Sequence, residues 1–421
     1  MSDRTTPSRR SFLGGLAAGS GLWVLPQATS AGSQDVSGPE ALALALESVA
    51  PGTTLRLAPG DYGGLGFRRG GGAAGAPVTL AAADPAHPPR FDRMDLREVA
   101  HLVLEGLQFD YTFSAADKIY FRPFTVVDSR DVTIHGCLFD GDCARGVSAV
   151  DDGFGWAFGL GVTEVVGFAI EGCEIRDFFR GLVVARCRDV TVLGCDLHDL
   201  RMDGMNFAQV QNVRIEGNQI HDFNRSLDSK DHADMIQFWT NGTDAPSTDI
   251  VIRGNLLASG QGWFTQSIFM RNEEVDKGRA GDGMFYRNIL IEENVIANAH
   301  LHGISVGETD GLVIRQNTVL RNALSEGEAD NPPLWTPMIR VAEKARNVYI
   351  TGNIVAKIVG YEGQTDWQVS DNLFVQDRTR MEAGFYDKVF TGSPADPATL
   401  RYLAGGPADG TGIGAARLQL D

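Results

Sequence analysis

One short phrase recurs from about residue 99 to residue 376 and limits what this chain can fold into. Each copy alternates apolar and polar residues, as in residues 213–218 (VRIEGN) and 250–255 (IVIRGN), and closes with Gly or a substitute followed by Asn or Cys. A period of two is typical of a β-strand, and a repeat of about 22 residues, with longer copies between, is typical of a solenoid. The closing residues are Leu107, Cys137, Cys173, Cys195, Asn218, Asn255, Asn294, Asn317, Asn353 and Asn372.

We therefore predict an all-β fold, a single-stranded parallel β-helix in which each turn stacks on the last at the ~4.8 Å strand spacing. The recurring Asn would form a ladder at one bend, because stacked amides hydrogen-bond to one another and Asn tolerates a left-handed backbone. Cys137, Cys173 and Cys195 would continue that ladder as small buried groups. The chain has 5 cysteines and no C-x-x-C pair, which favours stacking over a metal or redox site.

The two ends of the chain depart from the repeat. Residues 41–49 are amphipathic, follow a Ser37/Glu40 start signal and stop at Pro51, which predicts a short helix capping the solenoid. Strands are expected at residues 54–57 and 78–80. We divide the chain into a signal peptide (1–31), an N-terminal cap helix with the first coils (32–98), the parallel β-helix (99–376) and a C-terminal cap or tail (377–421).

The first 31 residues have the pattern of a twin-arginine export signal. Arg9 and Arg10 precede Phe12, an apolar run covers residues 14–25, and small residues lead to a cleavage point after Ala31. The apolar run is shorter than the ~20 residues that span a bilayer, which argues against a membrane anchor. We expect a periplasmic or secreted protein without membrane insertion.

The net charge of the chain excludes some classes of binding partner. The net charge is −17, so the surface will not hold nucleic acid non-specifically and offers no basic membrane patch. An anionic substrate therefore needs a local cluster of Arg, Lys or metal ion. We expect the protein to act as a monomer or homodimer.

Ionisable groups gather before one strand-like run, at residues 228–239 (DSKDHADMIQFW). Similar strands in the neighbouring turns also carry polar groups near their starts. Stacked turns would bring these groups into one groove suited to an extended polymer. The candidate catalytic residues are Lys230, His232, Arg271 and His302. The candidate substrate-binding residues are Arg201, Asp203, Asp234, Gln237, Trp239, Glu273 and His300.

Removal of a proton beside a sugar carboxylate needs a cation or donor to neutralise that carboxylate and a base to take the proton. Lys230 or His232 would be the base, and Arg271 and His302 would neutralise the carboxylate or protonate the leaving oxygen. Asp234 would orient His232, or bind Ca²⁺ with Asp231 and Glu273. Structural roles compete: Lys230 as a solvated loop charge, Asp234 as a turn cap and His302 as a packed histidine.

Residues 51–55 (PGTTL), 59–62 (PGDY) and 77–80 (PVTL), followed by the Gly-Asn turns, resemble the right-handed parallel β-helix carbohydrate-active proteins. Among these, the chain is most similar to the alginate and chondroitin lyases and the mannuronan C5-epimerases. The resemblance implies a right-handed, pectate-lyase-like solenoid and an acidic polysaccharide substrate. Residues 231–234 (DHAD) replace the Asp-Pro-His run of the epimerases, and the Glu-x-Glu run of the calcium-dependent lyases has no counterpart.

The expected function is therefore a polysaccharide lyase that cleaves a uronic-acid polymer, alginate first, by β-elimination. Three alternatives stay open: a mannuronan C5-epimerase, a glycoside hydrolase that uses Asp203, Asp234 and Glu273, and a non-catalytic carbohydrate-binding β-helix.

Overall fold

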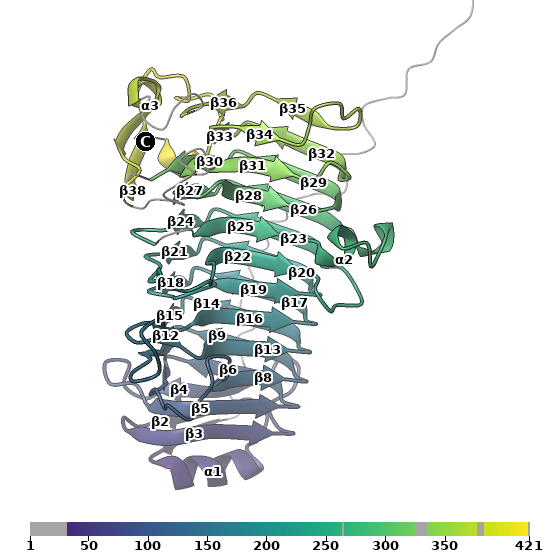
Figure 1. Ribbon diagram of the computed structural model, residues 1–421. Helices are drawn as coiled ribbons and strands as arrows, with labels where there is room; N and C mark the ends of the chain where they lie inside the picture. Colours follow the sequence, from purple (N-terminus) through teal and green to yellow (C-terminus); the bar gives the residue numbers. More distant parts are fainter. Residues whose placement is uncertain (1–31, 263–264, 323, 325–334, 377–382, 420–421) are drawn as a thin grey trace, which may run out of the picture.

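The computed structural model describes residues 32–262, 265–322, 324, 335–376 and 383–419. The predicted export signal lies outside these residues. The described chain winds into a tall stack of coils in which parallel strands pair with the strands above and below (Figure 1). The predicted all-β parallel β-helix is confirmed. In the described part of the chain, no helix is long and apolar enough to cross a membrane.

The strands form three ladders. The first ladder contains, in order, β1 (Gly32–Val36), β2 (Thr53–Leu57), β4 (Val78–Ala82), β6 (Ala100–Glu105), β9 (Arg130–His135), β14 (Val166–Glu171), β17 (Arg188–Leu193), β20 (Gln211–Glu216), β23 (Thr248–Arg253), β26 (Tyr286–Glu292), β29 (Thr309–Arg315), β32 (Arg346–Thr351) and β35 (Gln368–Ser370).

The second ladder carries the candidate site. It contains β3 (Asp61–Arg68), β5 (Arg90–Arg97), β8 (Phe124–Val127), β13 (Phe158–Thr163), β16 (Arg180–Ala185), β19 (Met205–Ala208), β22 (Asp234–Trp239), β25 (Gln266–Met270), β28 (His302–Val306), β31 (Met338–Val341) and β34 (Ile358–Val359).

The third ladder is made of shorter strands and joins the second through β5. It contains β7 (Gln108–Asp110), β10 (Leu138–Asp140), β15 (Glu174–Arg176), β18 (Asp196–His198), β21 (Gln219–His221), β24 (Leu256–Ala258), β27 (Val295–Asn298), β30 (Thr318–Arg321), β33 (Ile354–Val355) and β36 (Leu373–Phe374).

Apolar side chains stack inside the coils because the register repeats without a slip over most of the stack. In the first ladder Val213 pairs with Ile250, which pairs with Ile289, and all three are buried. In the second ladder the rings of Phe207 and Phe238 stack 4.8 Å apart. The period-two pattern thus places one side of every strand in a continuous core that no single turn could form.

The asparagine ladder forms as predicted. Asn255 Nδ2 donates to Asn294 Oδ1 at 2.9 Å, and Asn294 Nδ2 donates to Asn317 Oδ1 at 2.9 Å. Each Oδ1 also accepts from the backbone N–H of the asparagine below it. We expected Asn to adopt the left-handed conformation at the bend, and this was wrong. The residue before each Asn adopts it, such as Gly254 (φ 63°) or Glu293 (φ 59°). Glycine is common there because it has no Cβ to clash.

The cysteines fill the same structural role. Cys137 N–H donates to Cys173 Sγ at 3.3 Å, and Cys195 N–H donates to Asn218 Oδ1 at 2.8 Å, so sulfur accepts in the N-terminal part of the column and amide oxygen accepts from Asn218 onward. Cys187 belongs to a different bend, where its Sγ accepts from Val165 N–H as the Ser247 hydroxyl does from Val210 N–H. Burial raises the pKa of the Cys187 thiol to about 11, which keeps it protonated.

The N-terminal cap is the helix α1 (Pro39–Ser48), at the foot of the stack in Figure 1. Leu42, Ala45 and Leu46 are its buried residues. The helix begins after Gly38 rather than Ser37, and no side chain caps it. Pro39 at the first helical position explains this start, because its missing N–H needs no partner.

The insertions and the C-terminal segment add the remaining elements. These are β11 (Asp142–Cys143), β12 (Gly155–Trp156), α2 (Glu273–Asp276), η1 (Asp282–Met284), α3 (Ala383–Val389), β37 (Phe390–Ser393), β38 (Asp396–Tyr402) and η3 (Ala416–Leu418). Phe390, Leu400 and Tyr402 form a second apolar cluster with residues of the third ladder such as Leu256 and Ile354. The C-terminal segment therefore covers the outer flank of that ladder.

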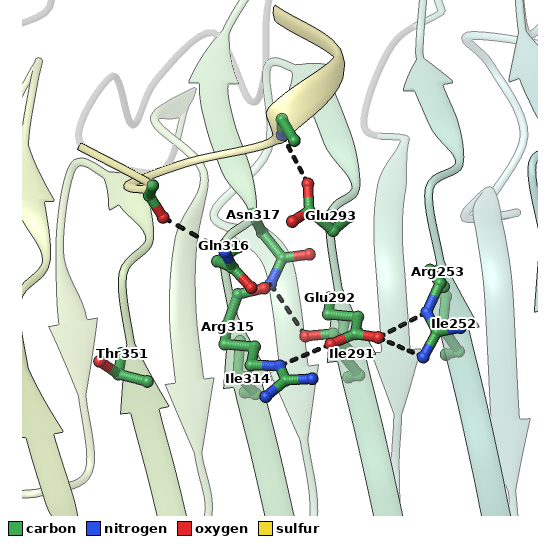
Figure 2. A network of polar contacts seen from close by, with 12 residues as sticks. Ile252, Arg253, Ile291, Glu292, Glu293, Ile314, Arg315, Gln316, Asn317 and Thr351 are labelled. Carbon is green, nitrogen blue, oxygen red and sulfur yellow. Dashed lines mark hydrogen bonds and ion pairs between the residues drawn. The ribbon is translucent and has the colours of Figure 1, made fainter. Parts of the chain in front are cut away.

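Polar contacts also tie neighbouring layers of the first ladder together, as Figure 2 shows. Glu292 bridges Arg253 below and Arg315 above, three residues in register in the first ladder. At the next position, Glu293 accepts a hydrogen bond from the backbone N–H of Ala416. The domain limits at residues 32, 99 and 377 stay a prediction.

Candidate functional site

The site lies at the amino-terminal edge of the second ladder, around β19, β22 and β25. Asp234 begins β22 and pairs with Gln266, the first residue of β25. Asp203 occupies the equivalent place before β19, and Arg180 the equivalent place in β16. These side chains therefore lie in consecutive layers, ~4.8 Å apart.

Asp203 and Asp234 form a buried carboxyl pair, and both side chains are 0% exposed. Asp203 accepts a hydrogen bond from Asn206 Nδ2 at 3.0 Å and another from the Asp234 backbone N–H at 3.1 Å. Arg180 Nε lies 3.1 Å from Asp203 Oδ2. One carboxylate thus receives a cation and two N–H donors.

Asp234 has far less support for a negative charge. Its Oδ2 accepts from Gln237 Nε2 at 2.7 Å, and Gln237 Oε1 accepts from Asn206 Nδ2 at 2.6 Å. Burial, and secondly the charge of Asp203, raise the pKa of Asp234 well above its usual value. Burial raises the pKa of Asp203 too, but Arg180 and the Asn206 amide oppose that rise, so Asp234 holds a proton more firmly than Asp203 does.

Acceptor atoms without partners converge at this edge. Asn206 Oδ1, Asp234 Oδ1 and Gln266 Oε1 are buried and make no hydrogen bond to any described residue. They come from three consecutive layers of the same ladder. Because an unpaired buried acceptor is costly, such a cluster favours a ligand that brings hydroxyl or other donor groups.

His232 stands in front of the pair. Its Nε2 lies 3.6 Å from Asp234 Oδ2, and its side chain is 51% exposed. The segment between β21 and β22 carries His232 together with Arg225 and Lys230. Lys230 is exposed, and its side chain contacts none of the described residues by hydrogen bond or ion pair.

Two further histidines lie above His232 and are neutral in the folded protein. Burial, and then the charges of His232 and Arg225, lower the pKa of His300 to about 4. Burial, and then the charges of His300 and Arg340, lower the pKa of His302 to about 3. A neutral imidazole has no charge to offset a substrate carboxylate, so the expected cationic role of His302 lacks support.

His302 is also held firmly. Its ring stacks on His300 with centroids 5.1 Å apart, and its Nδ1 lies 2.6 Å from Ser305 Oγ. Its backbone N–H donates to His300 Nδ1. These contacts fix the ring orientation without a carboxylate partner.

The structure does not bring the other predicted residues to this edge. Arg271 and Glu273 follow β25, so they lie at the opposite end of the strands, near α2 (Figure 1). Arg271 pairs with Asp276, and Glu273 accepts from the Thr240 N–H at 2.8 Å. Trp239 ends β22 and lies at that far end as well.

Arg201 has a structural partner on each side. Its guanidinium pairs with Asp151 at 2.8 Å and with Asp231 at 2.9 Å, and it is 2% exposed. The arginine therefore ties the insertion around Asp151 to the segment that carries His232. Its effect on a substrate would be indirect.

A calcium site built from Asp231, Asp234 and Glu273 does not fit this arrangement. Asp231 is bound to Arg201, and Glu273 is bound to Thr240 at the far end of the ladder. Within the described residues, no three His, Cys, Asp or Glu side chains gather as metal ligands would.

Arg180, Arg225 and Asn206 were not identified from the sequence. Arg180 occupies the same register position as Asp203 in the adjacent strand β16, a signal that the repeat provides once the strands are aligned. Arg225 gave no signal, because its position follows from the path of a long insertion.

Residues 126–377 match a family model described as a right handed beta helix region. A search of the curated proteins found no match. Among solved structures, the chain is similar to the pectate lyase Pel9A (11% identity, 88% of each chain covered, TM-score 0.42). It is also similar to PfbA, a surface adhesin of Streptococcus pneumoniae (11% identity, 80% of this chain and 86% of that chain covered, TM-score 0.47). A third is a PL6 family polysaccharide lyase from Pseudopedobacter saltans (11% identity, 83% and 94% covered, TM-score 0.40).

Proposed function

The chain belongs to the right-handed β-helix family, and from that premise we propose that it is a polysaccharide lyase that cleaves a uronic-acid polymer, alginate first, by β-elimination. The observation that carries the proposal is the exposed His232 imidazole backed by the buried Asp203–Asp234 pair. We further propose that the protein is exported by its twin-arginine signal and acts in the periplasm or outside the cell.

His232 is the proposed base and acid. It removes the C5 proton of the uronate, the C5 electron pair forms the C4–C5 double bond, and the C4–O4 bond breaks. The imidazolium then returns its proton to the leaving O4, so one residue serves both steps. Asp203, whose charge interacts with His232, stabilises the imidazolium while it exists, since a nearby negative charge favours the charged form of the ring.

Arg225 is the proposed partner of the sugar carboxylate. It shares a segment with His232, and its charge reaches His300 in the next layers. Pairing the carboxylate with a guanidinium makes the C5 proton removable. This role takes the place that the sequence assigned to Arg271. Lys230, exposed beside His232, is the competing base.

The test follows absorbance of the unsaturated uronate while the chain without residues 1–31 is incubated with alginate. We expect His232→Ala to lower the rate by at least about a hundredfold, in the range of a lost general base. Lys230→Ala should keep most of the rate, because its side chain contacts no catalytic group. Equal loss in both variants would favour Lys230 as a partner in catalysis, and full activity of His232→Ala would exclude this site.

The second candidate is a glycoside hydrolase, favoured by one observation. Asp203 and Asp234 are neighbouring carboxyl groups with unequal support for a negative charge, as an acid and nucleophile pair needs. New reducing ends without ultraviolet absorbance would support the hydrolase, and a change in uronate composition without cleavage would support an epimerase.

A further inference from the structure

A surface hollow lies beside the same ladder, several coils toward the N-terminus. It is lined by Ala116, Asp117, Lys118, Tyr120, Phe121 and Arg122. Tyr120 is 57% exposed, and the Lys118 ammonium lies 5.7 Å from its ring centroid. An exposed aromatic ring next to a cation is a suitable platform for a sugar with a negative group.

The charges of the hollow favour an anion. Asp117 is already engaged, because it accepts from the Tyr111 hydroxyl at 3.1 Å and pairs with Arg93. Lys118 and Arg122 are exposed and form no ion pair with any described residue. In a chain with a net charge of −17, two such neighbouring cations stand out.

The position of Arg122 is built into the coil rather than left to solvent. Its guanidinium lies over the Phe158 ring, 5.0 Å from the centroid, and the Arg180 guanidinium lies 5.1 Å from the same centroid. A Cβ on Gly161 would come within 3.0 Å of Arg122 Cδ, so glycine at that position leaves room for the arginine. Arg180 is neutralised by Asp203, whereas Arg122 is not.

The hollow also lies on the path of a chain through the candidate site. Arg122 precedes β8 as Asp203 precedes β19, and β8, β13, β16 and β19 pair one after another. Three strand spacings separate Arg122 from Asp203, about 14 Å along the stack. A polymer bound along this edge would therefore reach both places.

We propose that Arg122, with Lys118 and Tyr120, forms a remote binding site for a sugar bearing a carboxylate or a sulfate. The identity of the polymer as a polyuronate rests on the proposed function. The site defines the path of the bound polymer along the stack, since the substrate extends from His232 toward the N-terminal coils. It contributes affinity rather than chemistry.

Calorimetric binding tests the site without turnover, using the chain that carries His232→Ala. The probes are an alginate oligosaccharide, the same oligosaccharide with its carboxyl groups reduced to alcohols, and a sulfated glucan. Arg122→Gln should weaken alginate binding about tenfold, as expected for a lost charge-assisted hydrogen bond. Arg188→Gln, which removes an exposed arginine from β17 in the first ladder, is the control with equal net charge and should bind like its parent.

Gly161→Ala is the second variant, because it keeps the Arg122 charge but takes its space; it should weaken binding by a smaller factor. If the sulfated glucan binds, Arg122→Gln weakens that binding and alginate does not bind, then the site is supported but its ligand is not a polyuronate. Unchanged alginate affinity in Arg122→Gln, or equal affinity for the reduced oligosaccharide, would overturn the site. Elimination by the unmodified chain is measured separately, so either idea can fail alone.

Discussion

At the scale of single residues, Asp234 has an unusual energetic role, since the fold buries this carboxyl group and burial raises its pKa well above the usual value. Unfolding exposes it, and its pKa returns to about 3.9. Above that pH the folded state binds a proton that the unfolded state lacks, so the contribution of Asp234 to stability falls as pH rises toward its folded pKa. The protein keeps a destabilising group beside the proposed base, as functional sites often do.

We expect Asp234→Asn to remove the loss of stability that accompanies rising pH. Asn is uncharged and retains an oxygen that can accept from Gln237. Unfolding midpoints measured from pH 4 to pH 8 should show a gain over the parent that grows with pH, by ~1.4 kcal/mol for each unit of pKa difference. Asp92→Asn, at an exposed position in β5, is the control. A gain that does not change with pH would mean that Asp234 is ionised in the folded protein.

At the scale of elements, the stack depends on the asparagine ladder. The side chain of Asn294 donates to Asn317 Oδ1, Ile252 O and Glu292 O, while its Oδ1 accepts from the Asn255 backbone. Each of these bonds is buried, and most tie one coil to the next. The ladder thereby satisfies backbone groups at a bend that strand pairing cannot reach.

Asn294→Ala should cost about 2–4 kcal/mol of unfolding free energy, since it removes several bonds and leaves buried groups unpaired. Asn294→Cys should cost less, because sulfur accepts the same backbone N–H in the Cys137–Cys173 part of the column. Asn241→Ala, which removes one exposed contact with Arg279, should change stability by less than ~0.5 kcal/mol. Denaturant titration gives all three values, and equal losses for Ala and Cys would contradict this account of the ladder.

The ladder was predictable and the site only partly so, for the same physical reason. Nearly every copy of the repeat ends in Asn or Cys after a strand with the same alternation, so the column can be read from the sequence alone. Placing Arg271 required the exact bounds of β25, which the sequence does not provide. Gln266 begins this strand and Arg271 follows its end, so the two residues lie one strand length apart. Arg180 and Arg225 matter through neighbours in space that are distant along the chain.

At the scale of the whole molecule, the stack is not uniform along its flanks. Each coil contacts only its neighbours, so the stability of a solenoid is nearly a sum over layers. The C-terminal segment breaks that rule, because Tyr402 contacts Thr318 and Ala415, and Glu293 binds Ala416. It links several coils of the third ladder and should make the upper half of the stack unfold as one unit.

Tyr402→Ala tests this link. The ring is 2% exposed and packs in the cluster with Phe390, so its removal should cost about 3–5 kcal/mol in the upper coils. Tyr402→Phe keeps the packing and loses the hydroxyl bonds, with an expected cost of about 1 kcal/mol. Hydrogen exchange should show faster opening in β27, β30 and β33 of Tyr402→Ala, with β4 and β6 unchanged. Uniform acceleration along the whole stack would instead mean that the protein unfolds as a single cooperative unit and that the segment does not divide it.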